Sequence, residues 1–372
     1  MKNILFFIES LSGGGAEKVL VTLLRHIDYS KFRIVLLTLV DTGILKNEID
    51  YSQISYRTII NQSNNPIHKL WNRIKYKLLY YYLPAKIVYN WIIPKKGIDT
   101  HIAFTEGYCT KLISYSTKDK LAWVHCDLKK LPWTQQEHIY SSIEEEKKTY
   151  LKYNNVICVS NNVKNIMQKE YGLKNVTTIY NPIDDKYILK LSNEVNNYEI
   201  SKGFNIISVG RLTYQKGYDL LIPIISRFIK KGMDIHLYLL GEGSEKKNLE
   251  HIIEKEKVEN NIHLMGYFNN PYSFMKKMDL FVCSSRSEGY SLVIAEALTL
   301  ELPVISMNCS GPNELLSKGK YGTLCNNYDE LYKAIEHAIQ DRDYYQKLKT
   351  SSTNRKSFFQ ITSIIRQIEE LL

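Results

Sequence analysis

The hydrophobic positions along this chain follow two alternating patterns. Short continuous apolar runs are typical of strands buried in a parallel sheet, whereas longer segments with an apolar side chain at every third or fourth position are typical of amphipathic helices. The apolar runs predict strands at residues 3–8, 32–39, 100–104, 121–125, 156–160, 204–209, 234–240, 262–265, 280–283 and 303–306. The periodic segments predict helices at residues 16–27, 217–230, 246–257 and 358–372. Because strands alternate with helices, we expect an α/β fold with two parallel sheets covered by helices.

A polar, asparagine-rich stretch at residues 186–202 lacks a clear period and is the expected linker between two domains. It separates an N-terminal domain, residues 1–185, from a C-terminal domain, residues 203–355. The last segment, residues 356–372, is expected to end in an amphipathic helix that packs back on the N-terminal domain. Ligands of parallel sheets bind beyond the carboxyl ends of the strands, so two facing sheets are expected to form a cleft.

The composition adds a preference for anionic partners. The chain has 372 residues, 49 Lys and Arg against 39 Asp and Glu, and a formal net charge of +10. Nucleotide phosphates, nucleic acid and an acidic membrane surface all suit such a charge. Six scattered cysteines form no C-x-x-C pair, and neither a secretory signal nor an apolar stretch of about 20 residues is present. We therefore expect a cytoplasmic protein.

Residues 285–305 read S-R-S-E-G-Y-S-L-V-I-A-E-A-L-T-L-E-L-P-V-I and follow a predicted buried strand. Gly289 allows the backbone to approach a ligand closely, and a helix is expected to begin near Ser291. Its free N–H groups form a ready anion site. Glu288 would lie beside that anion, and Glu296 would lie about one turn into the helix. Both carboxylates could accept hydrogen bonds from ligand hydroxyl groups. A nucleotide-sugar needs this combination. A capping carboxylate and a solvated helix face are the alternative interpretation of the two glutamates, which the full motif disfavours.

Residues 210–217, G-R-L-T-Y-Q-K-G, form a second loop between a strand and a helix. Arg211 can grip two phosphate oxygens, and Lys216 adds a mobile point charge. Two surface cations at a helix start are the alternative interpretation. However, the positive end of a helix disfavours cations, which suggests that an anion lies between them.

Together these motifs resemble the signatures of the retaining glycosyltransferases of family 4, which have the GT-B fold. The residues that carry the resemblance are Gly210–Gly217, Ser285–Ile305, the loop Gly13–Glu17, Val159–Asn161 and Tyr180–Asp184. It covers nearly the whole chain and is weakest between residues 41 and 97. It implies two Rossmann-like parallel-sheet domains, the N-terminal one binding the acceptor and the C-terminal one binding a nucleotide-sugar.

The resemblance also implies roles for single residues. The donor would be bound by Gly14, Gly15, Arg211, Lys216, Gly266, Tyr267, Glu288, Gly289, Tyr290, Ser291, Leu292 and Glu296. Catalytic roles would fall to Glu288, His125, Arg211 and Lys216, with His125 touching the donor sugar. Glu17 and Asp127 are candidate acceptor residues. For His125 a hydrogen-bonded histidine at a strand end is the alternative, and for Glu17 a first-turn carboxylate favoured by the helix dipole.

The family mechanism implies transfer with retention of the donor's anomeric configuration. No obvious nucleophile lies in the motifs, so we expect front-face attack by an acceptor hydroxyl while the diphosphate departs. UDP-sugars are the expected donors; guanosine and adenosine stay open. No cofactor and no metal are expected, because the Asp341-Arg342-Asp343 triplet lies on a polar stretch with no strand end before it.

The weakly matching region has a composition of its own. Residues 66–97 contain seven Lys or Arg, no Asp or Glu, and many Tyr and Trp. This mixture suits an anionic membrane surface, because cations meet lipid phosphates while aromatic rings settle at the interface. An ordinary amphipathic helix with a solvated basic face is the alternative. We expect the acceptor to be a glycan or a polyprenyl-linked sugar. If the membrane interpretation holds, the acceptor is lipid-linked, such as a polyprenyl-diphosphate sugar of a bacterial surface polysaccharide, and the enzyme lies peripherally on the inner face of the cytoplasmic membrane.

Three other functions compete with glycosyl transfer. A sugar-nucleotide epimerase needs neither an acceptor site nor a basic membrane patch. A non-catalytic nucleotide-binding or membrane scaffold would normally lack one of Arg211, Lys216, Glu288 and Glu296. A dinucleotide dehydrogenase needs G-x-G-x-x-G spacing, which the glycine loop lacks. We expect no nucleic-acid partner, because no nucleic-acid module is visible elsewhere.

Overall fold

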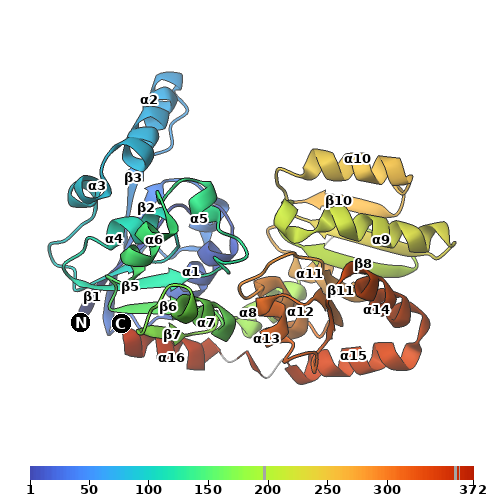
Figure 1. The fold of residues 1–372 in the computed structure, drawn as a ribbon. Helices are drawn as coiled ribbons and strands as arrows, with labels where there is room; N and C mark the ends of the chain where they lie inside the picture. Colours follow the sequence, from blue (N-terminus) through green and yellow to red (C-terminus); the bar gives the residue numbers. More distant parts are fainter. Residues whose placement is uncertain (196–197, 356–357, 360) are drawn as a thin grey trace. The chain divides into compact units, whose positions relative to one another are not determined.

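The computed structural model describes residues 1–195, 198–355, 358–359 and 361–372 (Figure 1). The chain divides into two compact units. Unit 1 comprises Met1–Pro182 together with Thr362–Leu372, and unit 2 comprises Ile183–Ile361. Residues 196–197 of the expected linker, and residues 356–357 and 360 of the expected C-terminal helix, lie outside the described residues.

Unit 1 is built around a parallel sheet that, in the described residues, has seven strands in the order β3-β2-β1-β4-β5-β6-β7. Their bounds are β1 Lys2–Ile8, β2 Phe32–Val40, β3 Ile54–Ile60, β4 Thr100–Ala103, β5 Asp119–Val124, β6 Asn155–Cys158 and β7 Val176–Thr178. The central strand β1 is almost wholly apolar and buried, as expected for a strand covered on both faces. The strand order reverses between β1 and β4, which are direct neighbours.

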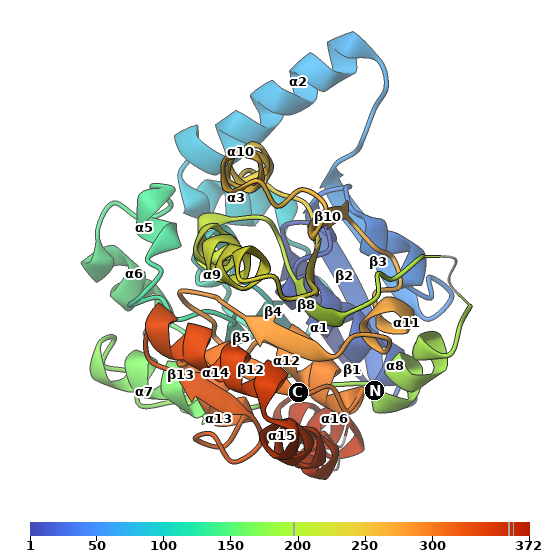
Figure 2. The same ribbon diagram turned by 90° about the vertical axis from the view of Figure 1, so that its right-hand side faces the viewer.

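Helices surround this sheet. They are α1 Gly15–His26, η1 Ile44–Glu48, α2 Pro66–Lys77, η2 Leu78–Tyr82, α3 Ala85–Ile92, α4 Tyr108–Ile113, α5 Trp133–Gln136, α6 Ile143–Tyr150, α7 Asn161–Lys169 and α16 Ile361–Leu371. Most of them bury an apolar stripe, as α1 does with Val19, Leu20 and Leu23. Helix α2 differs, because it buries no residue and extends away from the rest of unit 1 in both views (Figures 1 and 2).

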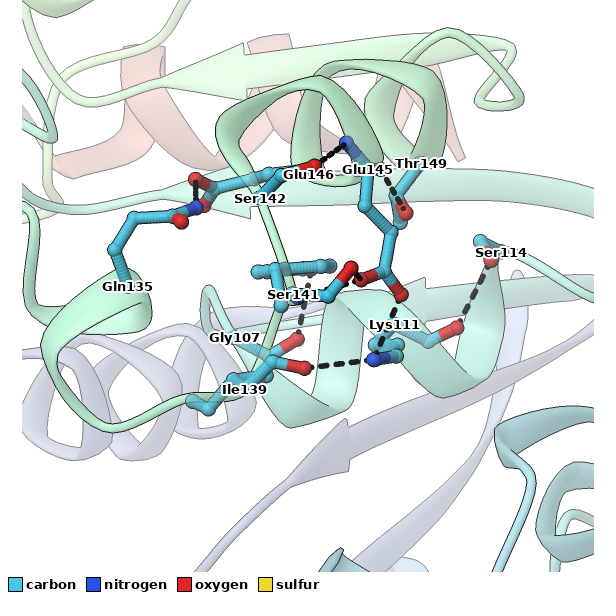
Figure 3. A network of polar contacts seen from close by, with 11 residues as sticks. Gly107, Lys111, Ser114, Gln135, Ile139, Ser141, Ser142, Glu145, Glu146 and Thr149 are labelled. Atoms are coloured by element: carbon cyan, nitrogen blue, oxygen red, sulfur yellow. Dashed lines mark hydrogen bonds and ion pairs between the residues drawn. The ribbon is translucent and has the colours of Figure 1, made fainter.

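A polar network fixes the segment between α4 and α6 (Figure 3). Lys111 of α4 forms an ion pair with Glu145 at 2.8 Å and donates to the carbonyl oxygen of Ile139 at 2.7 Å. Glu146 is buried and accepts hydrogen bonds from Thr134, Gln135 and Tyr171. Burial raises the pKa of Glu146, and these three donors oppose that rise. The network holds the loop that follows β5 against the sheet.

Unit 2 repeats the plan with a parallel sheet whose described strands number six, in the order β10-β9-β8-β11-β12-β13. The strands are β8 Phe204–Val209, β9 Ile235–Leu240, β10 Ile262–Gly266, β11 Leu280–Cys283, β12 Val304–Met307 and β13 Thr323–Cys325. The helices are α8 Asp185–Ser192, η3 Tyr214–Lys216, α9 Tyr218–Lys230, α10 Lys246–Glu256, α11 Tyr272–Met275, α12 Leu292–Thr299, α13 Ser310–Leu315, α14 Tyr328–Gln340 and α15 Arg342–Arg355. Helices α9, α10 and α14 share one apolar core with the sheet. The strand order reverses between β8 and β11.

The structure confirms the predicted α/β class with two parallel sheets. Three strands, β3, β7 and β13, were not predicted; the last two have only three residues each. The first part of the expected linker is not irregular but forms helix α8. The Asp184 carboxylate caps this helix by accepting from the Tyr187 N–H at 2.9 Å, and Ile188 packs inside. One buried apolar residue and a cap stabilise a helix that periodicity alone does not reveal.

Candidate functional site

The two sequence motifs of unit 2 meet where the strand order of its sheet reverses. Residues 210–217 follow β8, and residues 284–291 follow the neighbouring β11. This is the place where open α/β sheets bind their ligands. The two loops are packed backbone to backbone. Gly217 has φ +68°, and a Cβ there would overlap the carbonyl oxygen of Ser284. The Ser284 hydroxyl in turn donates to the carbonyl oxygen of Lys216 at 2.8 Å.

A buried ion pair joins the motifs. The Lys216 ammonium lies 2.6 Å from Oε1 of Glu288, and the Ser285 hydroxyl donates to the same oxygen at 2.7 Å. Burial alone would lower the pKa of Lys216, but the Glu288 carboxylate outweighs it and raises the pKa above its ordinary value. Lys216 therefore stays protonated at neutral pH, and Glu288 is held in one position by two donors.

Arg211 lies in the same loop as Lys216 but is exposed. Within the described part of the chain, its guanidinium has no ion pair and no hydrogen bond. The site thus combines a fixed cation, Lys216, with an exposed guanidinium. An anion that reaches this edge of the sheet meets both charges.

Helix α12 begins directly after the second loop, at Leu292, with Ser291 as its N-cap. Ser291 adopts φ +72° and ψ +77°, a left-handed conformation that is strained for a non-glycine residue. Its hydroxyl is buried and has no hydrogen-bond partner in the part of the chain that the structure describes. The first N–H groups of a helix also lack partners within the helix. A bound phosphate would satisfy both the hydroxyl and the N–H groups.

The loop that carries Gly289, Tyr290 and Ser291 is supported from behind by Gly311 of α13. A Cβ at Gly311 would lie 2.6 Å from backbone atoms of Tyr290, and the Gly311 N–H donates to the carbonyl oxygen of Glu288 at 3.0 Å. Only a glycine fits this contact, so α13 fixes the path of the loop.

Glu296 is buried one turn into α12 and accepts a hydrogen bond from the Tyr272 hydroxyl at 3.2 Å. Gly266 ends β10 with φ +72° and accepts from the Gly241 N–H at 2.7 Å. Tyr267 follows it and is about half exposed. Gly266 and Tyr267 lie at the carboxyl end of β10, whereas Glu296 belongs to α12, the helix that follows β11.

Arg286 is a residue of this site that the sequence did not single out. Its guanidinium binds both carboxylate oxygens of Asp219 at 2.8 Å and the carbonyl oxygen of Tyr214 at 2.6 Å. The Tyr214 ring lies 3.8 Å from the guanidinium carbon. In addition, Gln215 donates to the carbonyl oxygen of Ser287 at 2.7 Å. These bonds fasten the two loops together and leave Arg211 as the cation that faces solvent.

In unit 1 the glycine loop follows β1 and leads into α1, which begins at Gly15 with Gly14 as N-cap. The Glu17 side chain folds back over Gly14, so closely that a Cβ at Gly14 would overlap a Glu17 carboxylate oxygen.

Glu9 directly follows β1, is partly buried, and accepts a hydrogen bond from Tyr80 at 3.2 Å. The sequence did not single out Glu9, although a charged residue directly after a fully apolar strand was the available signal.

His125 follows β5 and donates its Nε2–H to the carbonyl oxygen of Phe104 at 2.8 Å. Burial lowers the pKa of His125, so the ring is neutral at pH 7 and Nδ1 is an acceptor. The backbone N–H groups of His125 and Cys126 both bind Oε1 of Glu106, a buried carboxylate that the sequence did not reveal. Asp127 is also buried and accepts from the backbone N–H groups of Lys129 and Lys130, which caps a turn.

No group of three or more His, Cys, Asp or Glu residues in the described part of the chain is arranged to hold a metal ion. Among the helices described, none combines the length and the apolar character needed to cross a bilayer.

Comparison with known proteins decides the family. The model for "Glycosyltransferase Family 4" matches residues 13–187, and the model for "Glycosyl transferases group 1" matches residues 192–355. An uncharacterized glycosyltransferase of Methanocaldococcus jannaschii is 30% identical over 321 residues, which are 83% of this chain and 82% of the relative. The chain belongs to the family 4 glycosyltransferases of group 1.

A second relative of this glycosyltransferase comes from Campylobacter jejuni. It is named N-acetylgalactosamine-N,N'-diacetylbacillosaminyl-diphospho-undecaprenol 4-alpha-N-acetylgalactosaminyltransferase and is 27% identical over 377 residues, 98% of each chain. Among solved structures, Anabaena Alr3699/HepE in complex with UDP and glucose has a TM-score of 0.75, 21% identity, and coverage of 100% of this chain and 99% of its own. WaaG, a glycosyltransferase involved in lipopolysaccharide biosynthesis, has a TM-score of 0.71 at 14% identity, with 99% of each chain covered. These likenesses confirm the expected GT-B fold.

The fold of the glycosyltransferase brings the residues singled out in each unit to one edge of that unit's sheet. In unit 2 these are Arg211, Lys216, Gly266, Tyr267, Glu288, Gly289, Tyr290, Ser291, Leu292 and Glu296. In unit 1 they are Gly14, Gly15, Glu17, His125 and Asp127. Lys216 Nζ, Glu288 Oε1, His125 Nε2 and Asp127 Oδ1 each have a protein partner, whereas no partner of the Arg211 guanidinium or the Ser291 hydroxyl is found among the described residues.

Proposed function

We propose that this glycosyltransferase moves a sugar from a UDP-sugar to a hydroxyl group of a glycan or lipid-linked acceptor, with retention of the donor's anomeric configuration. The single observation that carries the proposal is the start of α12. There a buried, unpartnered Ser291 hydroxyl and free helix N–H groups follow a loop that holds the Lys216–Glu288 pair. A diphosphate supplies the oxygens that these donors lack, and a sugar supplies hydroxyls for Glu288.

Two further observations support a nucleotide-sugar. Glu296 is a buried carboxylate about one turn along α12, at a suitable separation for a ribose hydroxyl when the diphosphate lies at the helix start. The solved neighbour Alr3699/HepE was crystallised with UDP-glucose as well as with UDP and glucose. Uridine is therefore the proposed base, and Gly266 and Tyr267 at the end of β10 would border it.

In the proposed reaction the chain supplies charge and orientation. The bond between the anomeric carbon and the diphosphate breaks as the acceptor oxygen attacks from the same face, and the acceptor proton passes to the departing phosphate. Arg211 and Lys216 would stabilise the negative charge that develops on UDP, by about 3 kcal/mol each if they act like single oxyanion-hole donors. Glu288 and His125 would hold sugar hydroxyls, Glu288 through its carboxylate and His125 through Nδ1. With two cations at the diphosphate, the proposal needs no metal and no cofactor.

For the acceptor we propose a sugar linked through a diphosphate to a polyprenyl chain, during surface-polysaccharide assembly. The name of the Campylobacter jejuni relative, which spans 98% of this chain, describes transfer to such a diphospho-undecaprenol acceptor. A relative from Escherichia coli, 33% identical over 171 residues, is named an O-antigen biosynthesis glycosyltransferase. Glu17, beside the glycine loop of unit 1, is a proposed acceptor-binding residue.

A polyprenyl-linked acceptor requires contact with a membrane, and we propose that residues 66–97 provide it. Within this region Ile67, Leu70, Trp71, Tyr82 and Trp91 are each more than half exposed. Ile67, Leu70, Trp71 and Ile74 repeat at helical spacing along α2, which buries no residue. Lys69, Arg73 and Lys77 form a second stripe along the same helix. Large apolar side chains beside cations, with no carboxylate in the region, are complementary to an anionic lipid surface. The enzyme would then act peripherally on the cytoplasmic face.

Calorimetric titration tests the donor half of the proposal. Wild type and Glu296→Ala are titrated with UDP, GDP, UDP-glucose, UDP-N-acetylglucosamine and UDP-N-acetylgalactosamine. We expect saturable binding of one UDP-sugar by wild type and about tenfold weaker binding by the variant, since a hydrogen bond to a carboxylate is worth about 1.5–3 kcal/mol. A folded wild-type protein that binds none of these ligands would contradict the proposal, and binding of GDP alone would correct the base.

A further inference from the structure

Glu9 is a carboxylate at the edge of the unit 1 sheet that has few partners among the described residues. It follows β1 directly, where the strand order reverses, and its backbone carbonyl accepts from the Val40 N–H at 2.9 Å. In the described structure its carboxyl group has one hydrogen bond, from the Tyr80 hydroxyl to Oε1 at 3.2 Å, and no ion pair. No donor to its second oxygen, Oε2, is found among the described residues, and the residue keeps part of its surface accessible.

Tyr80 is held in place by other aromatic rings. It lies in η2, a π-helical turn that continues α2, and turns of this kind are frequent at functional sites. Its ring stacks on Tyr76 at 5.0 Å and on Tyr108 at 4.3 Å between centroids. The Tyr108 hydroxyl donates to the carbonyl oxygen of Leu79 and thereby anchors the turn to α4. The position of the Tyr80 hydroxyl is therefore fixed from both sides.

The groups around Glu9 favour its protonated form over the carboxylate. Burial raises the pKa of Glu9 to about 7, the Tyr80 hydrogen bond opposes this rise, and the Glu17 carboxylate of α1 adds to it. The other titratable groups that interact with Glu9 are Tyr76 of α2 and Tyr108 and Cys109 of α4, all of which are neutral at pH 7. Glu9 thus faces one carboxylate and four neutral groups.

Structural carboxylates elsewhere in unit 1 are satisfied much more fully. Glu145 pairs with Lys111 at 2.8 Å and accepts two bonds from Ser141 (Figure 3). Glu146 accepts three side-chain bonds, from Thr134, Gln135 and Tyr171. Burying a carboxylate that has only one neutral hydrogen-bond donor costs desolvation free energy, and apolar packing around it does not offset that cost. A ligand hydroxyl that donates a hydrogen bond to Oε2 would offset this cost.

We propose that Glu9 binds a hydroxyl group of the acceptor sugar and that Tyr80 is the positioning residue that sets the Glu9 carboxylate. This inference rests on the proposed function. It adds a second carboxylate beside Glu17 to the acceptor side of unit 1. It also links that carboxylate, through η2, to α2, the helix proposed to meet the lipid surface.

The experiment uses the full chain, the UDP-sugar that it binds, and a water-soluble acceptor probe, N-acetylgalactosamine joined through a diphosphate to a farnesyl chain. Glu9→Gln and Tyr80→Phe are compared with wild type and with two matched controls, Glu144→Gln and Tyr115→Phe. Three quantities are measured: the KM for the acceptor probe, the slow hydrolysis of the UDP-sugar without acceptor, and the pH profile of kcat/KM for the acceptor.

For Glu9→Gln we expect the acceptor KM to rise about tenfold while donor hydrolysis and UDP binding stay at the wild-type level. Wild type should lose acceptor kcat/KM below about pH 7, as Glu9 becomes protonated, and Glu9→Gln should lack this acidic limb. Because the Tyr80 hydroxyl lowers the pKa of Glu9, Tyr80→Phe should move the limb to higher pH. A purely structural role would not move the pH profile, and both controls should behave like wild type.

The possible outcomes separate the two proposals. An unchanged acceptor KM and an unchanged pH profile in Glu9→Gln would overturn the role of Glu9. Equal losses of donor hydrolysis and acceptor transfer would also overturn it, because they indicate a general defect. Wild type that binds the UDP-sugar but neither binds nor glycosylates the probe would contradict the acceptor assignment alone. Wild type that binds no UDP-sugar would contradict the proposed function itself.

Discussion

At the scale of single residues, the candidate site contains two cations in different states. Lys216 is buried and bound to Glu288 at 2.6 Å, whereas the Arg211 guanidinium is exposed and has no partner in the described part of the chain. The first is part of the folded framework as well as of the site. The Arg211 guanidinium makes no described contact that would stabilise the fold, so we assign it a role in ligand binding. Substitutions at the two positions should therefore have different signatures.

Arg211→Ala should lower kcat/KM for the UDP-sugar by about two orders of magnitude, because one donor to a developing oxyanion is worth roughly 3 kcal/mol. The melting temperature should stay unchanged, since no intramolecular bond of the guanidinium is lost. Initial-rate kinetics and a thermal melt check both points. Lys247→Ala, an exposed cation of α10, is the matched control. A drop in stability comparable to the drop in activity would contradict this interpretation of Arg211.

Lys216→Met should destabilise the protein by about 3–5 kcal/mol, because it leaves the buried Glu288 carboxylate without its charge partner. Chemical denaturation measures the loss. The double variant Lys216→Met, Glu288→Gln removes both charges and should recover most of the stability but no activity. A Lys216→Met variant as stable as wild type would contradict the claim that Lys216 neutralises a buried Glu288 carboxylate.

The residue scale also shows the limit of the sequence. Arg211, Lys216, Glu288 and Glu296 could be found because each has a fixed offset from the end of a strand. Glu9 could not be assigned a partner, because Tyr80 lies 71 positions away along the chain. Arg286 and Asp219 are 67 positions apart for the same reason. Long-range partners depend on the strand order, which local patterns do not encode.

At the scale of elements, the site is made by strand ends and by the start of one helix. Helix α12 has only eight residues and begins at Leu292, directly after the strained N-cap Ser291, so the loop before it shapes its N-terminus. Continuous apolar runs located β8 and β11, and the motif of residues 285–305 located α12. The apolar pattern missed β7 and β13, which are too short to show it, and it missed α8, whose cap at Asp184 and buried Ile188 are tertiary features.

Helix α2 should bind anionic membranes. Vesicles of phosphatidylcholine with phosphatidylglycerol should sediment the wild-type protein, and vesicles of phosphatidylcholine alone should sediment much less. Trp71→Ala should weaken binding to the anionic vesicles severalfold by removing apolar contact, and Arg73→Glu should weaken it more than tenfold, since each basic residue near the surface contributes about 1 kcal/mol. Arg366→Glu, an exposed cation of α16, is the control. Equal sedimentation of wild type and Arg73→Glu would exclude α2 as the contact.

At the scale of the whole molecule, the chain crosses between the units twice. After unit 2 it returns to unit 1, where α16 packs through Ile365 and Ile368. Lys2 donates to the carbonyl oxygen of Leu372, and the Glu369 carboxylate accepts from the Asp28 N–H at 2.9 Å and pairs with Lys31 at 3.1 Å. The last residues of the chain thus complete the unit that contains the first ones. The amphipathic pattern of the C-terminal segment predicted the helix, but these partners come only from the structure.

Glu369→Ala should lower the melting temperature of the protein, because it removes the bonds to Asp28 and Lys31. It should leave the Kd for UDP unchanged, because the proposed donor site belongs to unit 2. A thermal melt and a calorimetric titration of the same variant check both. Glu370→Ala, which removes only an exposed pair with Arg366, serves as the control. A weaker affinity for UDP in Glu369→Ala would show that the two effects are not separate.

The most direct test of the central claim is a crystal structure of the full chain with UDP. The diphosphate should lie at the N-terminus of α12, with the Ser291 hydroxyl, the first helix N–H groups, Arg211 and Lys216 around it, and Glu296 should bind the ribose. UDP bound at another edge of the sheet, or bound without contact to α12 and Arg211, would contradict the site described here.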